Sequence, residues 1–181
     1  MNRETVMNRP TLLTRHLASR AVVAALALSA FLPGLARADQ PSPGAVPFHA
    51  AIAETSAAAP CGPNLCATIT GSGQATYLGA ISEASSVVVD LLSNPAPGCF
   101  AETRTTTLTA ANGDQITMNH TGQVCFSATT GTALDSYVVT GGTGRYSGAI
   151  GSGTNRASID RVTGNAVTTF IGTLSSPGSL R

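Results

Sequence analysis

From residue 61 onward, short runs of Thr, Ser, Val and Ile alternate with turns rich in Gly, Asn and Pro. Runs of β-branched residues bounded by turn residues are typical of β-strands. The turn signals stand at 71–73, 94–98, 112–113, 141–144 and 164–165. The pattern predicts an all-β domain of eight strands, near 66–71, 74–81, 84–92, 99–110, 114–126, 134–141, 145–159 and 165–174.

Eight consecutive antiparallel strands can close into an up-and-down, calycin-like barrel. The interior of such a barrel is just wide enough for side chains or one small ligand. A β-sandwich built from the same strands is the alternative.

The hairpin over 99–125 has a register that follows from its turn. Ala111-Asn112-Gly113 is a three-residue loop with glycine at the position that needs a left-handed backbone. Ala110 then faces Asp114. With that register Cys99 lies opposite Cys125, and directly opposed residues bring Cα atoms to ~4.5–5.5 Å, within disulfide range.

The four cysteines, at 61, 66, 99 and 125, are an even number. In an exported chain this predicts two disulfides. The hairpin register predicts Cys99–Cys125, which leaves Cys61–Cys66 as a small loop. A Cys-x4-Cys spacing is unusual for zinc ligands, so we expect no metal site.

The register also sorts the hairpin into two faces. One face is Thr-, Asn- and Gln-rich. The other carries all the large apolar side chains and should line the interior, with Phe100, Glu102, Arg104, Thr106 and Leu108 opposite Val124, Gly122, His120, Met118 and Ile116. A one-residue slip would put these apolar groups on different faces.

Glu102, Arg104 and His120 are therefore predicted to point inward among apolar residues. Burying an unpaired charge costs several kcal/mol, so the three should pair with one another, lie near a mouth, or both. Two interpretations stay open: a structural ion pair that closes one end of the barrel, or the polar floor of a ligand cavity. If the protein is an enzyme, Glu102 or His120 would be the acid or base and Arg104 the charge partner.

Phe100, Met118 and Tyr137 are the candidates for contact with a small hydrophobic molecule. No nucleotide loop or Ser/His/Asp order stands in the chain, and we expect no cofactor.

The first 38 residues resemble an export signal. Arginines precede an apolar run over 21–32, and Ala36-Arg37-Ala38 is a cleavage pattern. The apolar run is too short to span a bilayer. We expect a signal peptide over 1–38, a linker or loose arm over 39–60 and the barrel over 61–181, in a protein that is secreted or periplasmic and not held in a membrane.

After residue 38 the chain holds five arginines, eight acidic residues and no lysine, a net charge of −3. Without a basic patch to neutralise phosphates, nucleic-acid binding is not expected.

A strand, Val138-Val139-Thr140, enters Gly141-Gly142-Thr143-Gly144 and leaves through Arg145-Tyr146 toward Gly148, Gly151 and Gly153. At these residues the chain resembles the allene oxide cyclase and dirigent superfamily, in particular its small exported bacterial members. The resemblance covers most of 61–181 and implies the barrel fold. It carries over the glycines at 141, 142 and 144 and the aromatic Tyr146, none of which is catalytic.

Two function classes remain open. The first, which we favour, is an exported barrel that binds a small apolar ligand or serves as a non-catalytic secreted domain. The second is what the resemblance implies: an isomerase of the allene oxide cyclase type, or a dirigent-like protein that steers the cyclisation or coupling of a hydrophobic substrate. The sequence leaves the oligomeric state undetermined.

Overall fold

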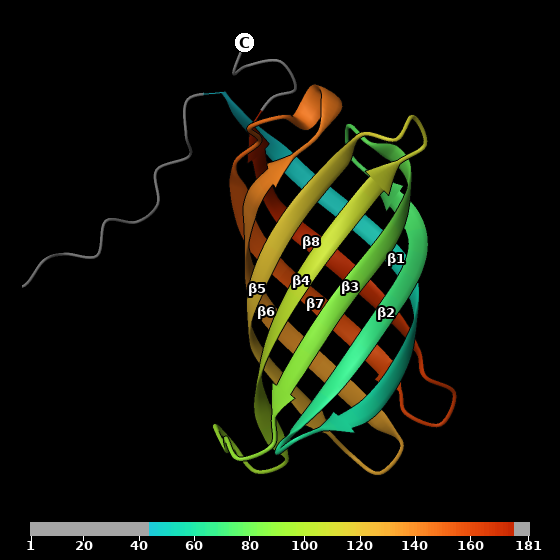
Figure 1. Cartoon of the computed structure of the whole chain (residues 1–181), viewed down its shortest axis with the longest axis vertical. Coiled ribbons are helices and arrows are strands. Elements are labelled where there is room, and N and C mark those ends of the chain that lie inside the picture. The colour runs from blue at the N-terminus through green and yellow to red at the C-terminus, as the bar shows by residue number, and fades with distance from the viewer. Residues whose placement is uncertain (1–43, 176–181) are drawn as a thin grey trace, which may run out of the picture. The chain divides into compact units, whose positions relative to one another are not determined.

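A computed structural model describes residues 44–175. Eight antiparallel strands close into one barrel in chain order, and the last strand pairs back to the first (Figure 1). The expected up-and-down barrel is confirmed and the sandwich alternative is wrong. The strands are β1 (Ala45–Cys61), β2 (Asn64–Ala75), β3 (Gly79–Asp90), β4 (Cys99–Ala110), β5 (Gln115–Phe126), β6 (Thr130–Gly142), β7 (Gly151–Asp160) and β8 (Asn165–Ser175), with a 3-10 helix, η1 (Gly144–Tyr146), before β7.

The predicted signal segment, 1–38, lies outside the described residues. No helix among residues 44–175 is long and apolar enough to cross a membrane.

The expectation of a loose arm over 39–60 is wrong from residue 45 onward, because Ala45–Cys61 forms β1. This strand pairs with both β2 and β8 and thereby closes the barrel. Its sequence is rich in alanine and contains two prolines, which weakened the strand signal. The alternation of buried and exposed positions from Pro47 to Glu54 is nevertheless that of a strand with one face inside.

The predicted turn at 71–73 is also wrong. These residues lie within β2, which runs without interruption from Asn64 to Ala75. Gly71 marks a close approach of two strands: a Cβ there would lie 2.7 Å from Ile52 Cγ2 and 2.8 Å from the Ala53 carbonyl oxygen on β1. Glycine in a strand can signal either a bend or such a contact, and here the contact explains it.

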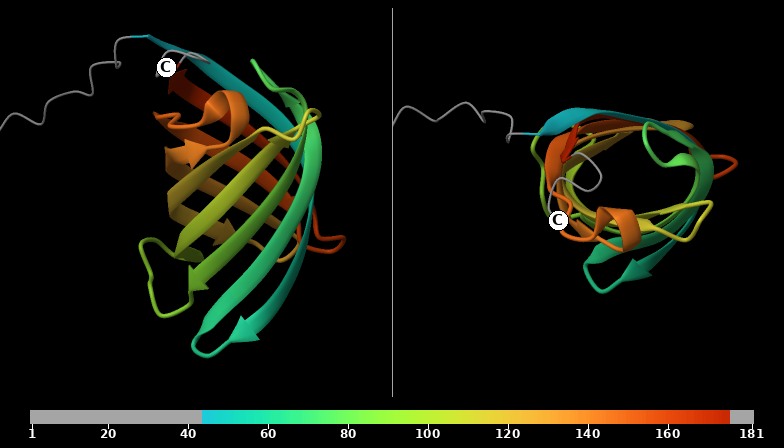
Figure 2. Two further views of the ribbon diagram at one scale, coloured as in Figure 1. Left: turned by 45° about the horizontal axis from the view of Figure 1, so that its top comes forward. Right: turned by 90° about the horizontal axis from the view of Figure 1, so that it is seen from above.

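The predicted strand over 145–159 begins later than expected, at Gly151. The residues before it form η1 and a turn that lie over one rim of the barrel (Figure 2). Tyr146 on η1 is buried, and its hydroxyl donates to the Tyr77 carbonyl oxygen over 2.7 Å. The aromatic of the glycine motif therefore plugs one end of the barrel.

The hairpin of β4 and β5 matches its predicted register. Cys99 pairs with Cys125 and Arg104 with His120, and Gly113 has a φ of 88° in the turn. Both predicted disulfides are present. The Cα atoms are 3.9 Å apart in Cys99–Cys125 and 5.7 Å apart in Cys61–Cys66.

Inward side chains form three zones along the barrel. A dense apolar cluster, including Phe48, Met118, Tyr146 and Phe170, fills the end that η1 covers, here called the packed end. A looser cluster of Val87, Val89, Val124, Ala133 and Ala157 occupies the opposite end. Between them lies a set of buried polar residues, here called the polar layer: Glu54, Glu83, Ser85, Glu102, Arg104, Thr106, His120, Asp135, Asn155 and Thr168.

Because β1 closes the barrel, we expect a chain that starts at Cys61 not to fold. It would expose the edges of β2 and β8 and would remove Glu54 from the polar layer. Circular dichroism melts test this: the chain that starts at Asp39 should unfold in one sharp transition, and the shorter chain should show none. A cooperative melt of the shorter chain would contradict the place of β1 in the barrel.

Candidate functional site

The polar layer is built around Arg104 on β4. Its Nη2 donates to Glu54 Oε1 over 2.8 Å and to Glu83 Oε1, and its Nε donates to Thr106 Oγ1 over 3.0 Å and to Ser85 Oγ over 3.2 Å. The Ser85 hydroxyl in turn donates to Glu83 Oε1 over 2.7 Å. The guanidinium and both carboxylates are almost completely buried. Arg104 therefore joins strands β1, β3 and β4 across the interior.

Glycines make room for the carboxyl groups of this layer. On β5, Gly122 stands between Glu102 of β4 and Asp135 of β6, each directly paired with it. A Cβ at Gly122 would lie 2.6 Å from the Asp135 Cα and closer still to its Oδ1. The Asp135 carboxyl therefore occupies the space that a side chain at Gly122 would fill, and Glu102 is paired with the same glycine from the other side.

The same arrangement recurs on the other side of Arg104. Gly71 of β2 stands between Glu54 of β1 and Glu83 of β3. A Cβ at Gly71 would lie 3.2 Å from Glu54 Cγ. Two acid–glycine–acid rows thus flank one guanidinium.

Burial changes the protonation of these acids. The pKa of Glu102 is raised to about 8, mainly because its charged form loses solvation and further because the Asp135 carboxyl lies beside it. Desolvation also raises the pKa of Glu83 to about 7, against the attraction of Arg104. The pKa of Asp135 is raised for the same reason, loss of solvation. Near neutral pH, Glu102 is therefore mostly a neutral carboxylic acid that can donate a hydrogen bond.

His120 is held differently from the expectation. Its Nδ1 lies 2.8 Å from Asn155 Oδ1, and Asn155 Nδ2 donates to Asp135 Oδ2 over 3.0 Å. Its ring packs against Tyr137 and Phe170, with centroids 5.7 Å and 5.9 Å away. Loss of solvation lowers the pKa of His120 to about 4. His120 is thus a neutral imidazole that orients Asn155.

The predicted trio shares the inward face but does not pair as predicted. Arg104 pairs with Glu54 and Glu83, Glu102 lies against Asp135, and His120 bonds Asn155. Mutual pairing of Glu102, Arg104 and His120, one of the two arrangements expected, is therefore wrong. The reason is that each side chain finds a nearer partner on a strand outside the hairpin.

A cavity of about 360 Å³ opens beneath the polar layer, in the half of the barrel that holds the Cys99–Cys125 bridge; this half is here called the cavity end. Glu54, Glu102 and Arg104 form its floor. Phe126, Asp160 and Arg161 lie at its rim, and the Arg161 guanidinium sits 4.7 Å above the Phe126 ring centre. The walls are apolar: Ala58, Leu65, Ala67, Ile69, Val87, Val89, Val124, Ala133, Ala157, Ile159 and Ala166.

The candidates for ligand contact do not line this cavity. Met118 and Tyr137 belong to the cluster at the packed end. Phe100 is half-buried against the looser cluster, its ring 6.1 Å from that of Phe126. All three face inward or toward the core, but only one half of the barrel is hollow, and sequence periodicity does not show which half.

Four polar residues of the site were missed or undervalued by sequence reasoning. Glu54 was assigned to the arm, and Glu83 fell between two predicted strands. Asp135 and Asn155 were given no role. The alternation of Ile81, Glu83, Ser85, Val87 and Val89 is the signal that could have placed Glu83 inside.

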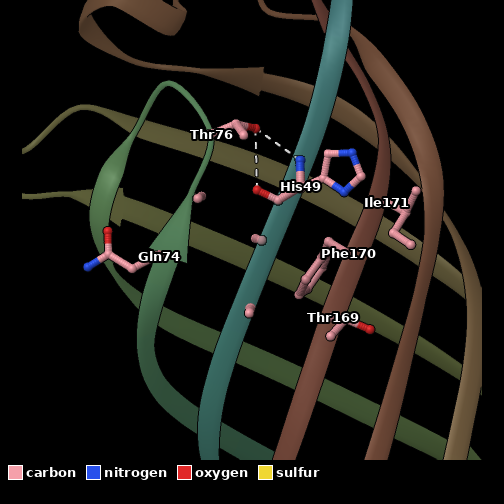
Figure 3. Close-up of a pocket in the computed structure, with 9 residues that line it drawn as sticks. His49, Gln74, Thr76, Thr169, Phe170 and Ile171 are labelled. Atoms are coloured by element: carbon pink, nitrogen blue, oxygen red, sulfur yellow. Dashed lines mark hydrogen bonds between the residues drawn. The ribbon is translucent and has the colours of Figure 1, made fainter.

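A second hollow, of about 460 Å³, lies where β1 runs between β2 and β8, around His49, Ala50, Ala75, Phe170 and Ile171. Figure 3 shows Thr76 bridging the His49 backbone: its Oγ1 accepts from the His49 amide over 2.9 Å and donates to the His49 carbonyl over 3.3 Å. This hollow is open to solvent, and no buried charged side chain faces it. We therefore place the candidate site in the inner cavity.

Comparisons with known proteins identify no family. No protein-family model matches the chain, and no curated protein matches it. Among solved structures, the chain is similar to a pterocarpan synthase dirigent protein, with a TM-score of 0.46 and 12% sequence identity over 72% of this chain and 88% of that one. At that level the similarity carries no argument about this protein's activity.

Replacing Arg104 with methionine should strongly destabilise the protein. It would leave Glu54 and Glu83 buried without their cation, which typically costs about 3–5 kcal/mol. Without the guanidinium the folded-state pKa of Glu83, already raised to about 7 by loss of solvation, rises further above its unfolded value. The stability that this carboxyl contributes is then present at low pH and lost as pH rises.

Thermal melts at about pH 5 and about pH 8 should therefore show a larger loss for Arg104→Met at the higher pH. Arg145→Met is the matched control, because the Arg145–Asp114 pair is on the surface, and its melting temperature should stay close to that of the wild type. An Arg104→Met variant that melts like the wild type at about pH 8 would show that the guanidinium is not buried as described.

Proposed function

We propose that the protein binds a small apolar molecule in the cavity at the cavity end of the barrel. Ligand pockets are typically apolar hollows of about 300–1,000 Å³ with a few polar groups that fix orientation. The inner cavity has this composition, with aliphatic walls, about 360 Å³ of volume and a floor of Glu54, Glu102 and Arg104.

The observation that carries the proposal is the unequal filling of the two halves. An eight-stranded barrel holds side chains or one small ligand. At the packed end, large side chains such as Phe48, Met118 and Phe170 fill the interior. At the cavity end, inward positions carry small residues, Ala133 and Ala157 among them, and leave space.

A second candidate function rests on Glu102. This carboxyl lies on the cavity floor, and its pKa is raised to about 8, so it holds a proton near neutral pH. A positioned carboxylic acid can protonate an oxygen of a bound substrate, which would suit steering a cyclisation or coupling. Glu102→Gln separates the two candidates, because it should keep the binding of neutral ligands and lose any turnover.

Export of the protein is part of the proposal. It is supported by the two disulfides, since such bonds persist in oxidising compartments. We expect material recovered outside the cytoplasm to begin at Asp39. Mass spectrometry of the intact exported protein tests this, and retention of residues 1–38 would contradict it.

Filling the cavity should block binding. Ala157 is buried on its wall, and Ala157→Phe would place a ring in the hollow without exposing apolar surface. We expect the affinity for prodan, a neutral naphthalene dye, to fall at least about tenfold, or about 1.4 kcal/mol. Fluorescence titration measures this.

The matched control is Ser158→Phe, one residue along β7 on the exposed face, and it should bind prodan like the wild type. Wild-type affinity in Ala157→Phe would place the binding site elsewhere and would overturn the proposal.

A further inference from the structure

The polar layer holds more acids than cations. Its titratable carboxyls are Glu54, Glu83, Glu102 and Asp135, and its cation is Arg104. His120 is neutral there. In a buried site such an excess of negative charge has to be neutralised by bound protons or by a cation.

The hydrogen bonds of Arg104 leave the Glu102–Asp135 pair of the polar layer without a cation. Arg104 directs its hydrogen bonds to Glu54, Glu83, Ser85 and Thr106. Asn155 donates to Asp135 Oδ2, and the other oxygen of Asp135, Oδ1, is buried without a partner. This oxygen lies over Gly122, the residue that pairs with Glu102 on the neighbouring strand.

We infer that the cavity takes an amphiphilic organic cation, an apolar body with one protonated amine whose N–H groups reach the Glu102 carboxyl on the floor. The inference rests on the proposed function and names the class of its ligand. An ammonium group would supply the positive charge that the Glu102–Asp135 pair lacks. An anionic head group would meet Glu54 and Glu102 instead, because Arg104 is already shared by two carboxylates.

Binding should release a proton. In the empty protein Glu102 holds one, and an ammonium placed against it favours the carboxylate, so the proton passes to solvent. The charged groups that act on Glu102 are Asp135 on β6, Arg104 on β4 and Glu54 on β1. Strands β3 and β5 present uncharged Val89 and Gly122 beside it. Asp160 at the end of β7 and Arg161 after it are the charged groups at the cavity rim, and the other lining residues of β7 and β8 are uncharged.

The test compares three probes with the same apolar body: 4-phenylbutylamine, 4-phenylbutan-1-ol and 4-phenylbutanoic acid. Binding is measured by calorimetric titration from about pH 6 to about pH 9, a range in which the amine stays protonated. We expect the amine to bind at least about tenfold tighter than the alcohol at the upper pH, and the acid to bind most weakly. The affinity of the amine should rise about tenfold per pH unit below the pKa of Glu102 and level off above it, about a hundredfold in all over this range, while that of the alcohol stays constant.

The variant Glu102→Gln keeps the shape of the side chain but has no proton to release. It should lose the rise in amine affinity with pH. The control Asp114→Asn removes a carboxylate at the packed end, where Asp114 follows the β4–β5 turn, and should preserve the rise.

Equal affinities for amine and alcohol, tighter binding of the acid, or an unchanged pH response in Glu102→Gln would each overturn the inference while leaving cavity binding intact. If none of the three probes competes with prodan, the proposed function fails and the inference fails with it.

Discussion

The buried guanidinium of Arg104 is the constraint on which the barrel depends. A charge in the interior is tolerated only when partners of opposite charge and further hydrogen bonds surround it. Its partners, Glu54 and Glu83, lie on β1 and β3, so the first, third and fourth strands must occupy their places before the charge is satisfied. The glycines at 71 and 122 then follow, because the flanking acids need the space beside the strands.

The polar layer also divides the barrel into two unlike halves. On one side aromatic and large aliphatic residues, with Tyr146 as a plug, leave a dense core. On the other side, small and β-branched residues leave a hollow that ends on carboxyl groups. The packed half supplies stability, and the hollow half exposes carboxyl groups with raised pKa values. This arrangement is suited to holding one small molecule. The proposed ligand site is therefore the part of the barrel that side chains leave unfilled.

The sequence predicted correctly the features that depend on local geometry. The turn at Gly113 set the register of β4 and β5, and with it the Cys99–Cys125 bridge and the inward face. The ion-pair partners of Arg104 were not predicted, because Glu54 is 50 residues away on a strand with a weak β signal. Nor could the sequence show which half is hollow, since an inward Ala157 and an inward Met118 follow the same alternation. Pairing across a closed barrel depends on strand order and shear, which no local pattern contains.

The most direct test of this account is the titration of Glu102, followed by carbon-13 NMR of its side-chain carboxyl and assigned with Glu102→Gln. A proton held on the cavity floor requires a midpoint near pH 8 in the empty protein. A midpoint near the ordinary glutamate value of about 4.3 would show a solvated carboxylate and would contradict both the buried layer and the cavity built on it.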